Sequence, residues 1–420
     1  MGRKIQAVKG TRDLLPPDTA VWAAVERAAR ETFGAYGYSE IRTPILEDTE
    51  LFVRSVGEST DIVGKEMYTF TDRKGRSLSL RPESTASVAR AFVQHGMHSA
   101  PLPLKVYYIG PHFRYERPQK GRYRQFFQIG AELVGDAGPQ SDGEVLLMLV
   151  RFLSVLGFEG LVVQLNTVGD EESREGYRKG LLEYLEPHRE ALSPDSQRRL
   201  GSNPLRILDS KDPADHAILE DAPRLESFLN SESAEHFEAV CSILDRHDVA
   251  YSIEPRLVRG LDYYTRTVFE IISEGLGAQD AIVGGGRYDG LIEELGGQPL
   301  PGIGFAIGED RLIEVLPKPF RDEALSATLV AVAAVPPVSA AEAVTLAEEL
   351  RSESLPAIAE LTDRSVRSAL KRADRAGARW VVLIGEEELA KGTVTVRDLE
   401  QGSQETLPRG EAATYLRRSR

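Results

Sequence analysis

Short strand-like runs follow one another through the first part of the chain, and this pattern constrains the fold more than any other feature. They are separated by glycine, proline and aspartate and cover residues 41–46, 66–71, 77–81, 104–109, 125–134 and 162–166. Strands that follow strands, rather than alternating with helices, predict a mainly antiparallel sheet. An amphipathic helix is predicted before them, from Asp18 to just before Gly37, because apolar residues recur there every three or four positions.

Helical and charged sequence interrupts the strand-like pattern from residue 169 to about 249, which predicts an insertion. Strand-like sequence resumes after it, and the glycine-rich run 302–307 leads into a predicted helix over 309–316. We therefore expect an α+β domain over residues 1–320 that contains this helical insertion.

The last part of the chain has a different texture. Pro317–Glu323 predicts a linker, and from 327 to 420 strand-like runs alternate with helical ones. The expected strands cover 327–335, 355–361, 380–385 and 393–399, and the expected helices cover 339–352 and 364–376. This alternation predicts a compact C-terminal α/β domain around a mixed sheet.

Basic residues gather in one loop of a chain that is acidic as a whole. The chain has 51 Lys and Arg against 65 Asp and Glu, a net charge of −14, so its overall field does not attract polyanions. Between Pro111 and Gln125, however, five basic residues stand against one acidic residue, which suits phosphates. In the next strand Gln128, Gly130 and Glu132 share one face, which predicts either a pocket for a small polar ligand or an exposed polar face.

Missing motifs exclude several kinds of site. The chain has no Gly-x-x-x-x-Gly-Lys-Ser/Thr phosphate loop, and residues 302–308 are one residue too long for a dinucleotide fingerprint. Cys241 is the only cysteine, so an intrachain disulfide and a cysteine-based zinc site are excluded. The N-terminus has no apolar core and Ala327–Val335 is too short to span a bilayer, so we expect a cytoplasmic protein without membrane contacts.

Three segments resemble the sequence motifs of class II aminoacyl-tRNA synthetases. The run Phe113-Arg114-x-Glu116 with the loop behind it resembles motif 2. Residues 38–57 are similar to the dimer-forming motif 1, and residues 302–312 are similar to motif 3. The resemblance implies the catalytic domain of that class, built on a mainly antiparallel sheet.

Two further segments separate one family from its class relatives. Residues 257–265 and 284–291 resemble the two signature peptides of histidyl-tRNA synthetases. The resemblance covers nearly the whole chain and implies a histidine–tRNA ligase. Such an enzyme activates L-histidine with ATP to histidyl-adenylate and transfers it to the 3′ end of tRNA(His). A homodimer and a C-terminal anticodon-binding domain are implied as well.

The same resemblance implies ATP as a substrate, bound with Mg²⁺ whose protein ligands stay unidentified, and no tightly bound prosthetic group. It places Arg114 at the α-phosphate, Glu116 at the adenine amino group and Arg311 at the γ-phosphate. It places Arg259 near both the histidine carboxylate and the α-phosphate. Arg114 and Arg259 are the implied catalytic residues, since a fixed positive charge stabilises the negative charge of the transition state.

A histidine-binding set is implied next. Glu83 and Thr85 would take the ammonium group, and Glu132 and Tyr264 would bond the two imidazole nitrogens. For Tyr263 the alternative is simple packing. The implied set comprises Glu83, Thr85, Gln128, Glu132, Arg259, Tyr263, Tyr264 and Tyr288.

Two basic surfaces are candidates for binding tRNA. The loop over residues 117–124 could reach the acceptor end, and the predicted helix 364–376 places basic residues on one face. A solvated face is the alternative for this helix. The candidate tRNA-binding residues are Gln119, Arg122, Arg364, Arg367 and Lys371.

A second interpretation is a regulatory relative that binds histidine without charging tRNA, like the regulatory subunit of ATP phosphoribosyltransferase. Such relatives typically lack the anticodon domain and lose the ATP-binding residues. This chain keeps Arg114, Glu116, Arg259 and Arg311, and it has the C-terminal segment. A third interpretation, a structural nucleic-acid-binding protein, does not explain the polar pocket residues beside the basic loop.

Overall fold

The chain forms two compact units, residues 1–321 and 322–420. The structure is a computed structural model that describes residues 5–57, 60–119, 121–208, 210, 212–261, 263–273, 281–326, 329–362 and 365–418. The segment expected as a linker is helical and forms α11 (Lys318–Leu325). None of the helices in the described part of the chain has the length and apolar character needed to cross a membrane.

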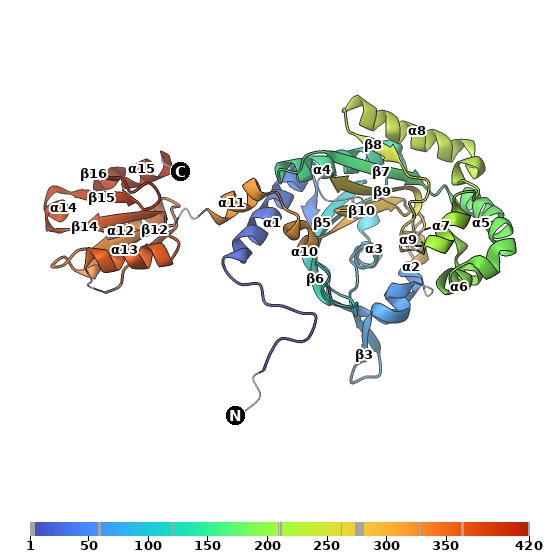
Figure 1. Cartoon of the computed structure of the whole chain (residues 1–420), viewed down its shortest axis with the longest axis horizontal. Helices are drawn as coiled ribbons and strands as arrows, with labels where there is room; N and C mark the ends of the chain where they lie inside the picture. The colour runs from blue at the N-terminus through green and yellow to red at the C-terminus, as the bar shows by residue number, and fades with distance from the viewer. Residues whose placement is uncertain are drawn as a thin grey trace. The chain divides into compact units, whose positions relative to one another are not determined.

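An eight-stranded sheet forms the middle of the first unit (Figure 1). Its strands, in spatial order, are β1 (Ser39–Glu40), β5 (Leu104–Phe113), β6 (Gln125–Val134), β11 (Gly302–Gly308), β10 (Val283–Arg287), β9 (Thr265–Ser273), β7 (Leu161–Thr167) and β8 (Tyr251–Ile253). The inner pairs run antiparallel, and only the outermost pairs, β1/β5 and β7/β8, are parallel. The prediction of a mainly antiparallel sheet is confirmed.

A smaller sheet stands beside it, with β4 (Ser77–Leu80) between β2 (Leu46–Asp48) and β3 (Tyr68–Thr71). The single strand expected over 41–46 is wrong, because residues 41–45 form the connection between β1 and β2. Pro44 has no N–H to donate to a strand ladder. The Thr43 carbonyl accepts from Nη1 of Arg81 at 3.1 Å rather than from a neighbouring strand.

Three helices pack around the sheet and one another. Helix α4 (Pro139–Val155) packs against β11, α10 (Glu309–Glu314) against β6, and α1 (Asp18–Ala35) against both helices. The fully buried ring of Phe33 in α1 lies 5.3 Å from Phe152 of α4 and 5.7 Å from Phe305 of β11, measured between centroids. The sequence predicted α1 but not α4, whose unbroken apolar run hides its helical period. The remaining helices of this body are α2 (Thr49–Val56), α3 (Thr85–Gln94) and α9 (Leu291–Glu294).

The insertion is a small helical body made of α5 (Glu171–Leu185), α6 (Pro194–Ser202), α7 (Pro213–Leu219) and α8 (Ser231–Arg246). The fully buried carboxylate of Asp215 joins its segments. It accepts from the N–H and the hydroxyl of Ser193 at 2.8 and 2.7 Å, from the hydroxyl of Ser196 at 2.6 Å, and from Ser210. Burial alone would raise the pKa of Asp215, but these hydrogen bonds hold it below its usual value.

Asp215→Asn is expected to lower the free energy of unfolding by about 2 kcal/mol, because an amide nitrogen replaces one acceptor oxygen among buried hydroxyl donors. The carboxylate stabilises the fold above its unfolded-state pKa, and this stabilisation is lost as the pH falls through the lower folded-state pKa. The difference between the two proteins in thermal unfolding should therefore shrink in acid. Asp221→Asn, at an exposed position of the insertion, is the control. A difference that is unchanged at about pH 3 would contradict the role of the charge.

The second unit is built on a mixed five-stranded sheet. In spatial order its strands are β13 (Ala357–Ala359), β12 (Val330–Ala334), β14 (Trp380–Ile384), β15 (Thr393–Asp398) and β16 (Gln404–Pro408). The first three are parallel and the last two pairs are antiparallel, so the predicted mixed sheet is confirmed. The sequence did not predict β16, a mostly exposed edge strand with polar residues.

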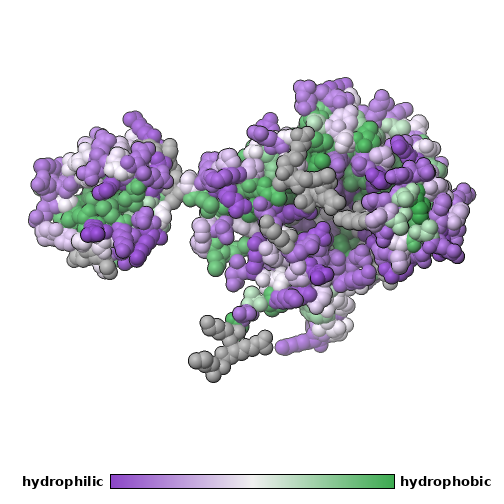
Figure 2. All heavy atoms as spheres, viewed as in Figure 1, coloured by the Kyte–Doolittle hydropathy of each residue, from purple (hydrophilic) through white to green (hydrophobic). Residues whose placement is uncertain are grey.

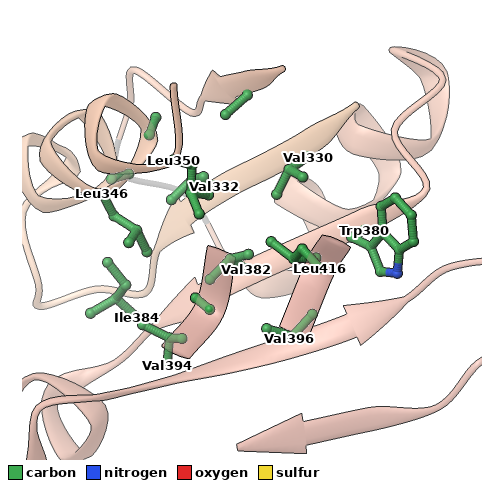
Figure 3. Packing of buried hydrophobic residues seen from close by; sticks show 14 of the residues in the cluster. Val330, Val332, Leu346, Leu350, Trp380, Val382, Ile384, Val394, Val396 and Leu416 are labelled. Carbon is green, nitrogen blue, oxygen red and sulfur yellow. The ribbon is translucent and has the colours of Figure 1, made fainter. Parts of the chain in front are cut away.

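The core of the second unit lies on one face of this sheet (Figure 3). Val330 of β12 and Val382 of β14 pack there with Leu346 of α12 (Ala340–Ser352) and Leu416 of α15 (Ala412–Arg418). Helix α13 (Val366–Arg375) packs through Ala373 and Leu370 against Ala331 of β12 and Val381 of β14. A short helix, α14 (Glu386–Lys391), follows β14. Hydrophilic side chains cover most of the visible face of each unit (Figure 2).

Candidate active site

The candidate site of the first unit is built around Glu132, a fully buried residue of β6. Its Oε1 accepts from the hydroxyl of Thr85 at 2.7 Å and from that of Tyr108 at 3.5 Å, and its Oε2 accepts from the hydroxyl of Tyr288 at 2.6 Å. Gly304 of β11 pairs with Glu132, and a Cβ at this glycine would lie only 1.7 Å from Oε2. The carboxyl group therefore requires glycine on the neighbouring strand.

The protonation state of Glu132 follows from its surroundings. Burial raises the pKa of Glu132 to about 8, although the hydrogen bonds from Tyr288 and Thr85 act in the opposite direction. The carboxyl group of Glu83 raises this pKa further. At neutral pH these surroundings favour a neutral carboxylic acid, and a ligand that brings a positive charge would favour its ionisation.

Glu83 lies two residues before the first residue of helix α3 and accepts from the first N–H groups of the helix. Its Oε2 accepts from the N–H of Thr85 at 2.7 Å, and its Oε1 accepts from the N–H of Ala86 at 2.9 Å. Burial raises the pKa of Glu83, and these two hydrogen bonds lower it. Each carboxylate oxygen has a second lone pair that can accept from a ligand.

Ser84 and His112 fasten the loop that carries Glu83 to strand β5. The two side chains are fully buried. Nδ1 of His112 donates to the carbonyl of Gly110 at 3.0 Å, so Nε2 accepts from the hydroxyl of Ser84 at 2.7 Å. Burial lowers the pKa of His112 well below its usual value, which keeps the ring neutral and this arrangement intact.

Three tyrosines stand together beside Glu132. The ring centroids of Tyr263 and Tyr264 are 4.6 Å apart, and those of Tyr263 and Tyr288 are 5.9 Å apart. Burial raises the pKa of all three hydroxyl groups, so they remain protonated donors at neutral pH. Tyr263 thus packs between two residues of the implied histidine set.

In the described part of the chain, Arg259 and Gln128 each have a buried polar atom without a hydrogen-bond partner. Nη1 of Arg259 forms an ion pair with Glu270 of β9, and its guanidinium lies over Gly284, where a Cβ would meet Nη2 at 2.2 Å. Nε of Arg259 and Oε1 of Gln128 are buried, and neither has a hydrogen-bond partner among the residues that the structure describes. Buried polar atoms without partners are rare in folded proteins, so they point to a ligand.

Behind the tyrosines, Arg287 is held in a fully buried ion pair with Asp142 of α4. Its guanidinium also donates to the carbonyl of Gly138 at 3.1 Å. On the other side of Asp142, Oδ2 lies 2.9 Å from Nε2 of His236, which belongs to helix α8 of the insertion. This network fixes the backbone next to Tyr288, whose hydroxyl bonds Glu132.

Arg114 and Glu116 lie at the end of β5, close to the loop of Glu83. Nε of Arg114 donates to the carbonyl of Pro82 at 3.0 Å, and its guanidinium lies 5.5 Å from the ring centroid of Phe126. Nη1 is 3.9 Å from Oε1 of Glu116. The guanidinium of Arg114 is thus held by the loop that carries Glu83 and by Glu116 at the start of the basic loop.

The basic loop turns back at Gln119 and Arg122, whose backbone groups bond each other at 3.1 and 3.0 Å. Nη1 of Arg122 is 3.7 Å from Oε2 of Glu116. Gly121 has φ +72°, and a Cβ there would lie 3.9 Å from Cβ of Arg311 in α10. The tip of the loop therefore lies beside Arg311.

The other candidate tRNA-binding residues belong to the second unit. Arg367 and Lys371 are exposed on α13, whose buried residues are Ala369 and Ala373. Arg364 lies outside the described residues. In the described parts of both units, no group of three or more His, Cys, Asp or Glu side chains is placed to hold a metal ion.

Sequence reasoning missed four contributors to the site. Tyr108 and His112 lie two and six residues along β5 from Val106, so strand alternation places them on one face and could have identified them. Asp142 and Glu270 gave no local signal. Asp142 is 145 residues from its partner Arg287, and the sequence around either residue does not predict this pairing.

Comparison with known proteins decides the family. A family model for histidyl-tRNA synthetase matches residues 10–169 and 195–312, and a model for the anticodon binding domain matches residues 330–419. The chain belongs to the histidyl-tRNA synthetase family. The resemblance drawn from the motifs and the two signature peptides is confirmed, and the C-terminal unit of this synthetase family member is its anticodon-binding domain.

Full-length relatives agree. A histidine–tRNA ligase of Alkalilimnicola ehrlichii is 49% identical and aligns with 100% of this chain and 97% of its own length. One of a Synechococcus species is 48% identical and aligns with 98% of both chains. The structure of apo S. aureus histidyl-tRNA synthetase covers 98% of this chain and 100% of its own, with 36% identity and a TM-score of 0.79.

The structure of an ATP phosphoribosyltransferase regulatory subunit/histidyl-tRNA synthetase from Bacillus halodurans also matches. It covers 92% of this chain and 100% of its own, with a TM-score of 0.65 and 23% identity. At that identity the likeness shows a shared fold only.

The raised pKa of Glu132 predicts a pH effect on the ligand-free chain. A neutral carboxyl group stabilises the fold below the usual pKa of 4.5, and this stabilisation is lost as the pH rises to about 8. The free energy of unfolding should fall by up to about 1.4 kcal/mol per pH unit in that window. Glu132→Gln should lack this contribution, because the amide does not titrate. Thermal unfolding of both proteins at several pH values measures it, and parallel profiles would contradict the buried acid.

Proposed function

We propose that the cluster around Glu132 binds L-histidine. The chain is a histidine–tRNA ligase, which activates histidine with ATP to histidyl-adenylate, releasing pyrophosphate, and transfers the histidyl group to tRNA. Ligation of histidine to tRNA is the activity of the family to which the chain belongs. The single observation that carries the assignment of the pocket is a buried carboxyl group with hydroxyl donors on both oxygens. Such a site rejects side chains without imidazole nitrogens, because its polar groups would be left unpaired.

Each residue of the histidine set has a proposed task. Glu83 and Thr85 accept from the ammonium group through lone pairs that helix α3 and Glu132 leave unused. Glu132 and Tyr264 bond the two imidazole nitrogens, and Gln128 contributes its unpaired Oε1. Tyr288 orients Glu132, and Tyr263 packs against both neighbouring tyrosines.

Activation follows from the placement of two cations. A carboxylate oxygen of histidine attacks the α-phosphorus, the bond from that phosphorus to the bridging oxygen breaks, and pyrophosphate leaves with the electron pair. Arg114 and Arg259 stabilise the charge on the phosphoryl oxygens. Glu116 accepts from the adenine amino group and Arg311 holds the γ-phosphate. Mg²⁺ enters with ATP as part of this substrate.

The remaining proposals concern the partners. Gln119 and Arg122 contact the acceptor end of tRNA(His), and the helix around Arg367 and Lys371, with Arg364, contacts the anticodon side. We place the enzyme in the cytoplasm as a homodimer. The residues Ile45, Leu46 and Phe70 are 40, 48 and 44% exposed, and they support an interface near the segment that resembles motif 1. The three values are well above those of core residues. 

Pyrophosphate exchange into ATP by the purified chain, with each amino acid in turn and no tRNA, tests the function. Exchange with histidine alone is the expected result, because the pocket matches an imidazole. Charging of tRNA(His) with labelled histidine then tests the second step. Histidine binding without exchange would instead favour the regulatory interpretation.

Arg259→Ala should reduce the rate of exchange by about a thousandfold, because it removes a fixed charge from the transition state. Binding of histidine, measured by calorimetry, should weaken only modestly. Arg256→Ala is the matched control, since Arg256 precedes the same segment and is largely exposed. A near-normal exchange rate in Arg259→Ala would rule out the proposed role.

A further inference from the structure

The segment that carries Arg259, Tyr263 and Tyr264 runs between two cavities. One, of about 310 Å³, is lined by Arg259 and Tyr264 from this segment and by Arg174, Arg178 and Arg206 from the insertion. The other, of about 540 Å³, is lined by Tyr263 and again by Arg174. Tyr263 and Tyr264 pack into hydrophobic clusters, while hydrogen bonds to the backbone of this segment help to fix it beside the two cavities.

The insertion supplies two of those hydrogen bonds. Nη1 of Arg174 in α5 donates to the carbonyl of Tyr264 at 2.8 Å. Nη2 of Arg206, in the short turn after α6, donates to the carbonyl of Gly260 at 2.6 Å. Guanidinium groups stay charged at every physiological pH, so both bonds are charge-assisted. The two arginines thus bond the backbone at Gly260, directly after Arg259, and at Tyr264.

The alternative, an anion site formed by the arginines of the first cavity, fits less well. Arg174 and Arg206 already point donors at backbone carbonyls. Arg178 is 3.9 Å from Glu175 on its own helix. Glu171 also lines this cavity and offsets part of the positive charge.

We propose that Arg174 and Arg206 are positioning residues, through which the helical insertion holds the histidine-binding segment in place. The proposal rests on the proposed function, because it takes Tyr264 as a histidine contact and Arg259 as the charge at the α-phosphate. The two arginines therefore affect different steps. Arg174 acts through Tyr264 on the binding of histidine, and Arg206 acts through Gly260 on the placement of Arg259.

Pyrophosphate exchange with separately varied histidine and ATP tests this division. Arg174→Ala should raise the KM for histidine by about tenfold and leave the KM for ATP nearly unchanged. Arg206→Ala should mainly lower kcat, also by about tenfold. Arg174→Lys, which keeps a charged donor, should recover part of the histidine affinity. Arg178→Ala is the matched control, because Arg178 lines the same cavity one turn along α5 and holds no carbonyl.

Exchange by the unmodified chain is measured first, so that failure of the proposed function is recognised separately. If the unmodified chain exchanges with histidine, two results overturn the inference. One is an Arg174→Ala variant that behaves like Arg178→Ala. The other is an equal loss of kcat in all variants with unchanged KM values, which would report only a smaller active fraction.

Discussion

The buried carboxyl group of Glu132 is the interaction on which the rest of the first unit depends. A carboxyl group costs free energy to bury unless donors surround it, and here Thr85, Tyr108 and Tyr288 come from three different parts of the chain to do so. Gly304 on β11 leaves the space that this group needs. These hydrogen bonds bring together the first residue of helix α3, strand β5 and the residue after β10.

Other buried charges are arranged around this centre and connect it to the insertion. Arg287, next to Tyr288, pairs with Asp142, which in turn meets His236 of α8. Removing one member of a buried pair costs several kcal/mol, roughly 3–5, because its partner is left without compensation. The insertion thus contacts both signature segments, one through this network and the other through Arg174 and Arg206.

Local patterns predicted much of this, and their failures have identifiable causes. Residues 125–134 form β6 as expected, since alternation in a strand is a property of neighbouring residues. The run at 41–46 has strand-like composition. Most of it stays out of a sheet because Pro44 has no N–H to donate and the Thr43 carbonyl accepts a hydrogen bond from Arg81. Helix α4 was missed because it is apolar around most of its circumference. The linker expected at 317–323 is helical.

The sequence alone determined the mainly antiparallel and mixed sheets and the family, because these depend on periodicity, composition and short motifs. It also named Glu83, Thr85, Glu132, Tyr264 and Tyr288 as one set by resemblance. Only the tertiary structure decided that Glu132 is buried among hydroxyl groups and has a raised pKa, and that Arg259 pairs with Glu270. It also decided that Arg174 of the insertion bonds the carbonyl of Tyr264. The physical reason is that burial and hydrogen bonding depend on residues that are far apart in the chain but close in space. A local sequence pattern does not show which distant residues come together.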